Sequence, residues 1–177
     1  MKAILMSIQP YWVFLIIAKS MGWDIKQEKT VEVRKNFPKD ESWDKTVKIY
    51  CSKDKKSFNR IPKEYQPAMK QFLGKVVGEF VCDDILTAKY GDYVSTFWEN
   101  SRLDAYDLMN YAHGKTLYGW HILKLLVYKK PKELNELRLY DVRAYYDEEL
   151  KLPMPTHEIK RPPQSWCYVV RSDNNGE

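Results

Sequence analysis

The chain has 177 residues, of which 44% are hydrophobic and 30% are charged. This length suits one domain with a core of ordinary size, and the composition excludes a disordered or collagen-like chain. Only seven glycines are present, so neither a glycine-rich phosphate loop nor a flexible linker is expected. We predict a single domain over residues 1–171, followed by a disordered polar tail at 172–177.

The net charge of +5 is unevenly distributed. Residues 26–75 hold fourteen basic and seven acidic side chains, a net charge of +7, so the remainder of the chain carries −2. A basic segment with interleaved tyrosine and phenylalanine suits a polyanion such as RNA or single-stranded DNA. The alternative is a solvated surface loop, because the lysines within 53–56 are typical of a turn.

The cysteines and the apolar start of the chain indicate the compartment in which the protein acts. Cys51, Cys82 and Cys167 are widely spaced, and no Cys/His ligand spacing occurs, so we expect reduced thiols, no metal and no cofactor. Gln9-Pro10 splits the apolar start into pieces too short to span a membrane. We therefore expect a cytoplasmic protein with no membrane partner, with a cleaved signal peptide as the alternative.

The pattern of apolar residues predicts short strands and helices without βαβ alternation. In the first half we predict a strand over 2–8, a buried helix over 10–20, a strand over 29–34, a strand over 46–52 and one short helix within 57–72. In the second half we predict a long strand over 74–85, a helix over 102–112, a β-rich run over 116–128 broken off at Lys130-Pro131 and a closing strand over 165–170. Gly78 marks a bulge or a close backbone approach in the long strand. These elements predict an α+β fold, a small, mixed and mainly antiparallel β-barrel with two or three helices packed against it.

The segment Lys29–Arg34 (KTVEVR) has the alternation of an extended strand. Its two valines would face a core, whereas Thr30, Glu32 and Arg34 would share the opposite face. Lys29 stands at the start, on the side of the valines, where its long side chain can swing toward either face. The polar face could hold a planar polar ligand, or it could be the solvated side of a sheet.

Each charged group of this strand has a chemical use. A buried Lys29 could lose its proton near neutral pH and act as a base, or stay charged beside Glu32 and bind an anion. Arg34 offers a planar fork for a phosphate or a base edge, and Glu32 can accept from an exocyclic amine such as that of cytosine. The simpler alternative is that Glu32 and Arg34 pair with each other at the rim.

Six segments, taken in order, resemble the ASCH family of small PUA-like domains. They are Met1–Pro10, Lys29–Arg34, Val47–Lys53, Gly74–Cys82, Tyr118–Tyr128 with Lys130-Pro131 after it, and Arg161–Trp166. The family signature, Gly-x-Lys-x-x-Glu-x-Arg, is matched except that Gln27 stands in place of the glycine. The ending Pro-Pro-Gln-Ser-Trp is similar to the phage- and prophage-associated bacterial members.

The resemblance implies a PUA-like barrel with a cleft between barrel and helices, lined by the signature strand, that takes RNA or a modified nucleobase. Gln164 and Ser165 follow rigid prolines and could form hydrogen bonds in this cleft, and Ser7 ends the first strand near its mouth. Trp166 could stack on a base or belong to the core, and of Trp120 and His121, which face opposite ways, we expect Trp120 in the core. The predicted ligand site is Ser7, Lys29, Thr30, Glu32, Arg34, Gln164, Ser165 and Trp166.

Some members of the family resembled here remove an acetyl group from modified cytidine with a lysine, a threonine and a glutamate. Their lysine falls on Lys29, but their threonine falls on Glu32, which cannot serve as a hydroxyl nucleophile. Thr30 is the nearest hydroxyl and lies on the other face of a regular strand, and Glu99 is the nearest candidate for their glutamate.

Three functions follow as hypotheses. The first is a module that binds RNA, single-stranded DNA or a modified nucleoside in a basic cleft around Lys29–Arg34. The second is an enzyme, either an amidohydrolase acting on an acylated pyrimidine nucleoside or a ribonuclease, with Lys29 and Glu32 as catalytic residues. The third is a phage-associated adaptor that binds only protein.

Overall fold

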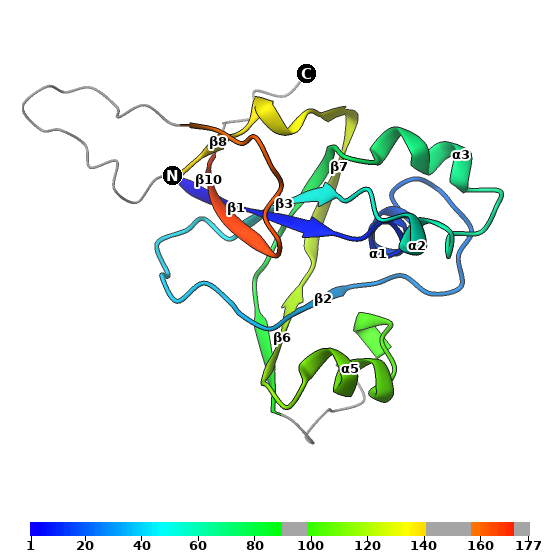
Figure 1. Cartoon of the computed structure of the whole chain (residues 1–177), viewed down its shortest axis with the longest axis horizontal. Helices are drawn as coiled ribbons and strands as arrows, with labels where there is room; N and C mark the ends of the chain where they lie inside the picture. Colours follow the sequence, from blue (N-terminus) through cyan, green and yellow to red (C-terminus); the bar gives the residue numbers. More distant parts are fainter. Residues whose placement is uncertain (90–98, 141–156, 172–177) are drawn as a thin grey trace, which may run out of the picture.

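The computed structural model describes residues 1–89, 99–140 and 157–171, and within these ranges the strands form two sheets (Figure 1). The larger sheet contains, in spatial order, β7 (Leu123–Lys132), β4 (Val76–Val81), β3 (Thr46–Cys51), β1 (Lys2–Ile8), β10 (Trp166–Val170), β8 (Arg138–Leu139) and β9 (His157–Glu158). The smaller sheet has the order β2 (Val31–Arg34), β6 (Leu117–His121) and β5 (Ile85–Ala88).

Strand β1 lies at the centre of the larger sheet, parallel to β3 and antiparallel to β10. The other adjacent strands of both sheets whose pairing the structure describes are antiparallel. The prediction of a mixed, mainly antiparallel α+β fold is therefore confirmed. The described strands do not close into a barrel, since β7 and β9 stand at opposite ends of the larger sheet.

Two segments of the chain, β4 with β5 and β6 with β7, run antiparallel to each other and join the two sheets. Strand β4 pairs with β7 in the larger sheet, and β5 pairs with β6 in the smaller one. The predicted strand over 74–85 is thus divided, because the link Cys82–Asp84 carries the chain from one sheet to the other. Gly78 lies at a register shift, and a Cβ there would stand 2.3 Å from the carbonyl oxygen of Leu126, so the predicted close approach is confirmed.

The helices gather at two places (Figure 1). Helices α1 (Pro10–Ile17), α2 (Lys55–Phe58) and α3 (Gln66–Met69), with the 3₁₀ turn η1 (Lys70–Phe72), lie beyond the carboxyl end of β1. The region 57–72 holds more helical turns than the single helix predicted. Helix α5 (Ala105–Ala112) lies beside β2, and the 3₁₀ turn η2 (Leu134–Glu136) follows β7.

Helix α5 begins later than the sequence predicts because its first turn is set by a cap. The side chain of Asp104 accepts a hydrogen bond from the amide of Asp107 at 2.7 Å, and Arg102 is left-handed, with φ 60°. The C-cap of the helix is His113, also left-handed with φ 47°, and it is followed by the left-handed Gly114 with φ 75°.

Two buried clusters position the site. Helix α1 is apolar on nearly all faces and packs against the larger sheet. Trp120, on β6 of the smaller sheet, is fully buried in the same cluster, as predicted. A second cluster joins α5 to the smaller sheet and holds Val31 and Val33, which confirms that the valines of the signature strand face a core. The valines thereby fix which way the polar side chains of β2 point.

Candidate functional site

A cavity of about 580 Å³ lies at the carboxyl ends of the parallel strands β1 and β3. Its walls come from β2, from α1 and α5, and from the prolines Pro162 and Pro163 before β10. Clefts at the carboxyl ends of parallel strands are common ligand sites, because the chain diverges there and leaves space. The size is typical of a small-ligand pocket.

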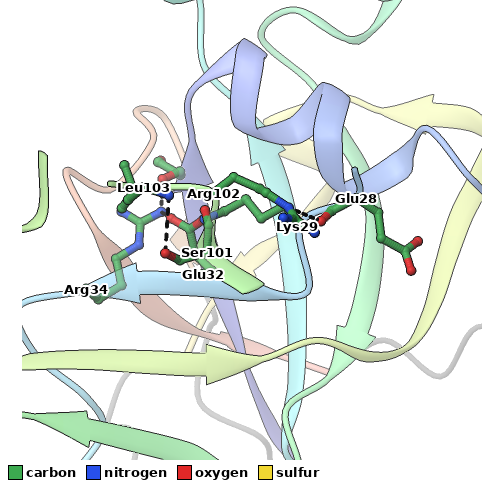
Figure 2. A network of polar contacts seen from close by, with 8 residues as sticks. Glu28, Lys29, Glu32, Arg34, Ser101, Arg102 and Leu103 are labelled. Carbon is green, nitrogen blue, oxygen red and sulfur yellow. Dashed lines mark hydrogen bonds and ion pairs between the residues drawn. The ribbon is translucent and has the colours of Figure 1, made fainter. Parts of the chain in front are cut away.

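The charged residues of the signature strand form a buried network at this cavity (Figure 2). Glu32 contacts Arg34 through an ion pair of 2.9 Å and Lys29 through a longer one of 3.4 Å. Lys29 Nζ also donates to the carbonyl oxygen of Ser101 at 2.7 Å, and Arg34 Nη2 donates to the carbonyl oxygen of Ser7 at 2.6 Å. All three side chains are more than nine-tenths buried, so the polar face of the strand is not solvated. Glu32 and Arg34 do pair with each other, as the simpler alternative predicted, but they do so below the surface.

Lys29 precedes β2 and lies on the side of Glu32, whereas a regular strand would have placed it with the valines. Its amide donates to the carbonyl of Leu15, which fixes the backbone beside the end of α1. Arg102 holds the same segment by donating from Nε to the carbonyl of Glu28 at 2.6 Å (Figure 2). The lysine can therefore swing to the polar face, as its long side chain allows.

The surroundings of Lys29 lower its pKa. Burial is the largest cause, and it lowers the pKa of Lys29 below the ordinary 10.5. The carboxylate of Glu32 acts in the opposite direction, while the positive charges of Arg34 and Arg102 add to the lowering. The Nζ also stands 5.0 Å from the ring centroid of Trp12, which lines the same cavity.

Several buried polar atoms at this cavity have no hydrogen-bond partner. Within the described residues, five buried side-chain polar atoms lack one, and three of these belong to cavity-lining residues, namely Glu32 Oε2, Arg34 Nε and Ser52 Oγ. A buried polar atom without a partner costs about 1–3 kcal/mol, so such atoms are rarely left in place without a reason. Their gathering at one cavity makes this cavity the candidate functional site.

The predicted site residues divide into two groups. Ser7, Lys29, Glu32, Arg34 and Gln164 line the cavity together. Ser7 holds the wall in place, since its hydroxyl donates to the carbonyl oxygen of Pro163 at 2.7 Å.

Thr30, Ser165 and Trp166 are not among the residues that line this cavity. The backbone of Thr30 bonds to Asn100 and Ile122, and the carbonyl oxygen of Ser165 accepts from the amide of Ser7. Trp166 is half-buried, with its ring centroid 6.0 Å from that of Trp120, and its Nε1 donates to Asn36 at 2.8 Å.

Two residues weighed from the sequence lie elsewhere. His121 faces away from the core, opposite to Trp120, and its Nδ1 lies 2.6 Å from a carboxylate oxygen of Asp83. Glu99 lines a second cavity, beside α1, and not the cavity of Glu32. The position of Glu99 therefore gives no support to a catalytic pair with Lys29.

Sequence reasoning did not identify several residues of the cavity. They are Trp12 on α1, Ser52 just after β3, Arg60 after α2, and Asp107 and Tyr111 on α5. Ser52 could have been found as the polar residue that ends a strand, in the way that Ser7 was. Tyr111 could not, because its place depends on how α5 packs against β2.

The charges that line the cavity are balanced. Lys29, Arg34 and Arg60 face three carboxylates, those of Glu32, Asp54 and Asp107. The positive charge lies instead on residues 53–75, which hold seven basic and two acidic side chains and so carry the entire net charge of +5. Most of these basic residues are exposed, and the segment reaches the cavity at Asp54 and Arg60.

Neither a metal-binding cluster nor a membrane-spanning helix occurs among the described residues. The part of the chain that the structure describes has no group of three histidine, cysteine, aspartate or glutamate side chains suited to hold a metal ion. Among these residues, no helix combines the length and the apolar character needed to cross a bilayer.

The comparisons with known proteins identify the fold. No protein-family model matches this sequence, and neither does any curated protein sequence. The structure is similar to the crystal structure of ASCH from Zymomonas mobilis, with 15% identity over 95% of this chain and 87% of that one and a TM-score of 0.49. A serine-to-alanine mutant of that protein matches with a TM-score of 0.50 at the same identity and coverage. The fold is ASCH-like. At this identity the likeness concerns the arrangement of the chain, and the chemistry must be argued from the cavity itself.

Proposed function

We propose that this protein binds a single unstacked nucleobase in the cavity of Lys29, Glu32 and Arg34. The observation that carries the proposal is the set of buried polar atoms at that cavity that lack a hydrogen-bond partner. These are Arg34 Nε and Ser52 Oγ, together with Glu32 Oε2, which has the 3.4 Å ion pair with Lys29 but no hydrogen bond. Glu32 presents an acceptor and Arg34 presents a donor, and a nucleobase edge offers the reverse pattern. The rings of Trp12 and Tyr111 line the same space and could stack on such a base.

The donor and acceptor pattern favours a cytosine-like base. A carboxylate accepts from the exocyclic amine of cytosine, and the adjacent ring nitrogen can accept from an arginine N–H. Because the charges lining the cavity balance, a neutral base is better suited to its interior than a phosphate. The basic segment 53–75 reaches the cavity at Arg60, and its exposed basic side chains would attract the backbone of RNA or single-stranded DNA.

Binding of defined ligands tests the proposal. Titration of the protein with cytidine, N4-acetylcytidine, a short unstructured RNA and the matching single-stranded DNA is expected to give saturable binding, weakened by Arg34→Ala. Affinity for the oligonucleotides should fall as salt rises, because counterions are released from the strand. The absence of binding by all four ligands would contradict the proposal.

A second candidate function is hydrolysis, and the lowered pKa of Lys29 favours it. A lysine whose pKa is lowered gives up its proton more readily, and the free amine can act as a general base. The hydroxyls of Ser7 and Ser52 belong to the cavity, although Ser7 already donates to Pro163. Incubation with N4-acetylcytidine and with RNA, beside a Lys29→Ala control, decides between binding and catalysis. Substrate that stays unchanged with the wild-type protein would rule out both the amidohydrolase and the ribonuclease.

Other predictions made from the sequence stay predictions. We propose that the chain belongs to the PUA-like superfamily in the phage-associated group and acts in the cytoplasm. A pull-down that returns a stoichiometric protein partner and no nucleic acid would favour the adaptor hypothesis instead.

A further inference from the structure

A second cavity, of about 830 Å³, adjoins the first beside helix α1. Tyr11, Phe14 and Tyr65 contribute aromatic rings to its lining. The two cavities share Arg60 and Leu103, so these two residues lie where the cavities adjoin. Both volumes fall within the roughly 300–1,000 Å³ that small-ligand sites occupy.

Arg60 occupies the junction and carries an exposed positive charge. Its guanidinium carbon lies 4.0 Å from the ring centroid of Tyr11 and 4.8 Å from that of Trp12. Tyr11 lines the second cavity and Trp12 lines the first, so the guanidinium spans an aromatic ring of each. Among the residues that the structure describes, no carboxylate forms an ion pair with Arg60, which leaves its planar fork available to an anion.

The charges of the second cavity limit where an anion could lie. Asp24, Glu64, Glu99 and Asp104 line it, against Lys26, Arg60 and Arg102. Four carboxylates disfavour a phosphate inside this cavity, whereas the aromatic walls favour a flat, uncharged ring. The junction at Arg60 is therefore the better place for a phosphate.

We propose that the two cavities form one site for two consecutive nucleotides of a single strand, with the linking phosphate on Arg60. The base in the first cavity meets Glu32 and Arg34, and the neighbouring base lies against the aromatic wall of the second. This inference rests on the proposed function and narrows it, since the ligand is then a polynucleotide and not a free nucleoside. Leu103 separates the two bases, which would be unstacked from one another.

A ladder of ligands tests each part of the site. The ligands are cytidine, the 3′ and 5′ monophosphates of cytidine, the dinucleotide CpC, and CpC analogues that lack either base. One of the two monophosphates should bind more tightly than cytidine, because a phosphate on that side reaches Arg60. CpC should bind about tenfold more tightly than the analogue that lacks the base of the second cavity, the gain typical of one stacked base.

Substitution of Arg60 tests the junction. In Arg60→Gln, the phosphate should no longer increase the affinity over that of cytidine. The plot of log affinity against log salt for CpC should become less steep by about 0.7, the contribution of one phosphate of a single strand. Arg60→Lys should keep most of the slope, because it keeps the charge. Lys70→Gln is the matched control: it removes an exposed charge of the same basic segment at a residue that lines neither cavity. Thermal unfolding of each variant verifies that the fold is retained.

The possible outcomes separate this inference from the proposed function. If cytidine binds but neither a phosphate nor a second base adds affinity, the first cavity works alone and the two-nucleotide site is wrong. If none of the ligands binds, the proposed function itself fails. An unchanged salt slope in Arg60→Gln would also overturn the role of Arg60, and so would an equal decrease in Lys70→Gln.

Discussion

Two buried lysine–carboxylate networks lie in different parts of this molecule, and they differ in how completely they are satisfied. Lys48 on β3 pairs with Glu79 on β4 at 2.7 Å, and the hydroxyl of Tyr128 donates to the same carboxylate at 2.6 Å. Both donors belong to the larger sheet. In contrast, the network of Lys29, Glu32 and Arg34 leaves two polar atoms beside a cavity without a hydrogen-bond partner, namely Glu32 Oε2 and Arg34 Nε.

The pKa shifts of Glu79 and Lys29 also differ in which effect determines their direction. Burial raises the pKa of the Glu79 carboxyl, but the hydrogen bonds from Lys48 and Tyr128 outweigh it, so the net pKa lies below the ordinary 4.5. For Lys29, burial outweighs the attraction of Glu32, and the pKa is lowered. A buried lysine is thus not by itself a sign of a functional site; incomplete satisfaction at a cavity is the informative feature.

The largest expected effect tests the two carboxylates. Glu32→Gln leaves the buried cations Lys29 and Arg34 without a counter-charge, and we expect the free energy of unfolding to fall by about 3–5 kcal/mol. Glu79→Gln should cost less, because the Glu79 side chain is 21% exposed and water can solvate what remains. Urea denaturation at pH 7 measures both. An equal loss of unfolding free energy in the two variants would show that water does not compensate for the change at Glu79 any better than at Glu32.

The second effect concerns ligand affinity. Arg34→Lys keeps the charge but removes the Nε donor, and we expect cytidine to bind about tenfold more weakly, the loss expected for one hydrogen bond to a charged group. Lys48→Met, which alters the lysine of the other network, should leave this affinity unchanged. Calorimetric titration of both variants gives the result. Wild-type affinity in Arg34→Lys would remove this arginine from the site.

The third effect is a pH dependence of stability. Because the folded-state pKa of Lys29 lies below 10.5, the unfolded chain binds this proton more tightly, and the wild-type protein gains stability relative to Lys29→Met as pH rises from the folded pKa toward 10.5. The difference in unfolding free energy should change by at most about 1.4 kcal/mol per pH unit. Urea denaturation between pH 6 and pH 10.5 measures this change. Tyrosine ionisation contributes equally to both proteins, so its effect is absent from the difference. Parallel curves throughout this range would contradict the lowered pKa.

The last prediction is that the three cysteine thiols react slowly in the folded protein. Burial raises the pKa of Cys51 and Cys82 to about 12 and that of Cys167 to about 11, so little thiolate is present at pH 8. We expect Ellman's reagent to label the folded protein slowly and all three thiols rapidly in urea. Cys51 ends β3 beside the cavity, so fast labelling of Cys51 alone would show that this end of the sheet opens, and the network of Lys29 with it.

Short-range patterns were enough to predict much of the site. The alternation within Lys29–Arg34 indicated which side of β2 is apolar, and the strand ends, with the family resemblance, indicated Ser7 and Gln164. The side on which Lys29 lies could not be predicted, because Lys29 precedes the strand and is held by bonds to Leu15 and Ser101, both remote in sequence. Trp12 and Tyr111 were missed for a related reason, since their place depends on how two helices pack around β2.

The errors in the fold have similar causes. The sequence predicts that the run after Thr116 stops at Pro131, but β7 continues to Lys132. Strand β7 is an edge strand of the larger sheet, where the missing amide of a proline need not break a ladder. Likewise, the periodicity of 74–85 does not change where β4 gives way to β5, because both strands have a buried face. The predicted tail at 172–177 lies outside the described residues.

The bond from Arg34 to the carbonyl of Ser7 joins β2 of the smaller sheet to β1 of the larger one. A ligand that binds to Arg34 would therefore stabilise the contact between the two sheets. Any ligand that binds only the folded state raises the unfolding free energy, by about 2.7 kcal/mol at a hundred times its dissociation constant. Here the added rigidity would concentrate in the amides of β1 and β2, so that slower hydrogen exchange in these two strands would report an occupied cavity without any label on the ligand.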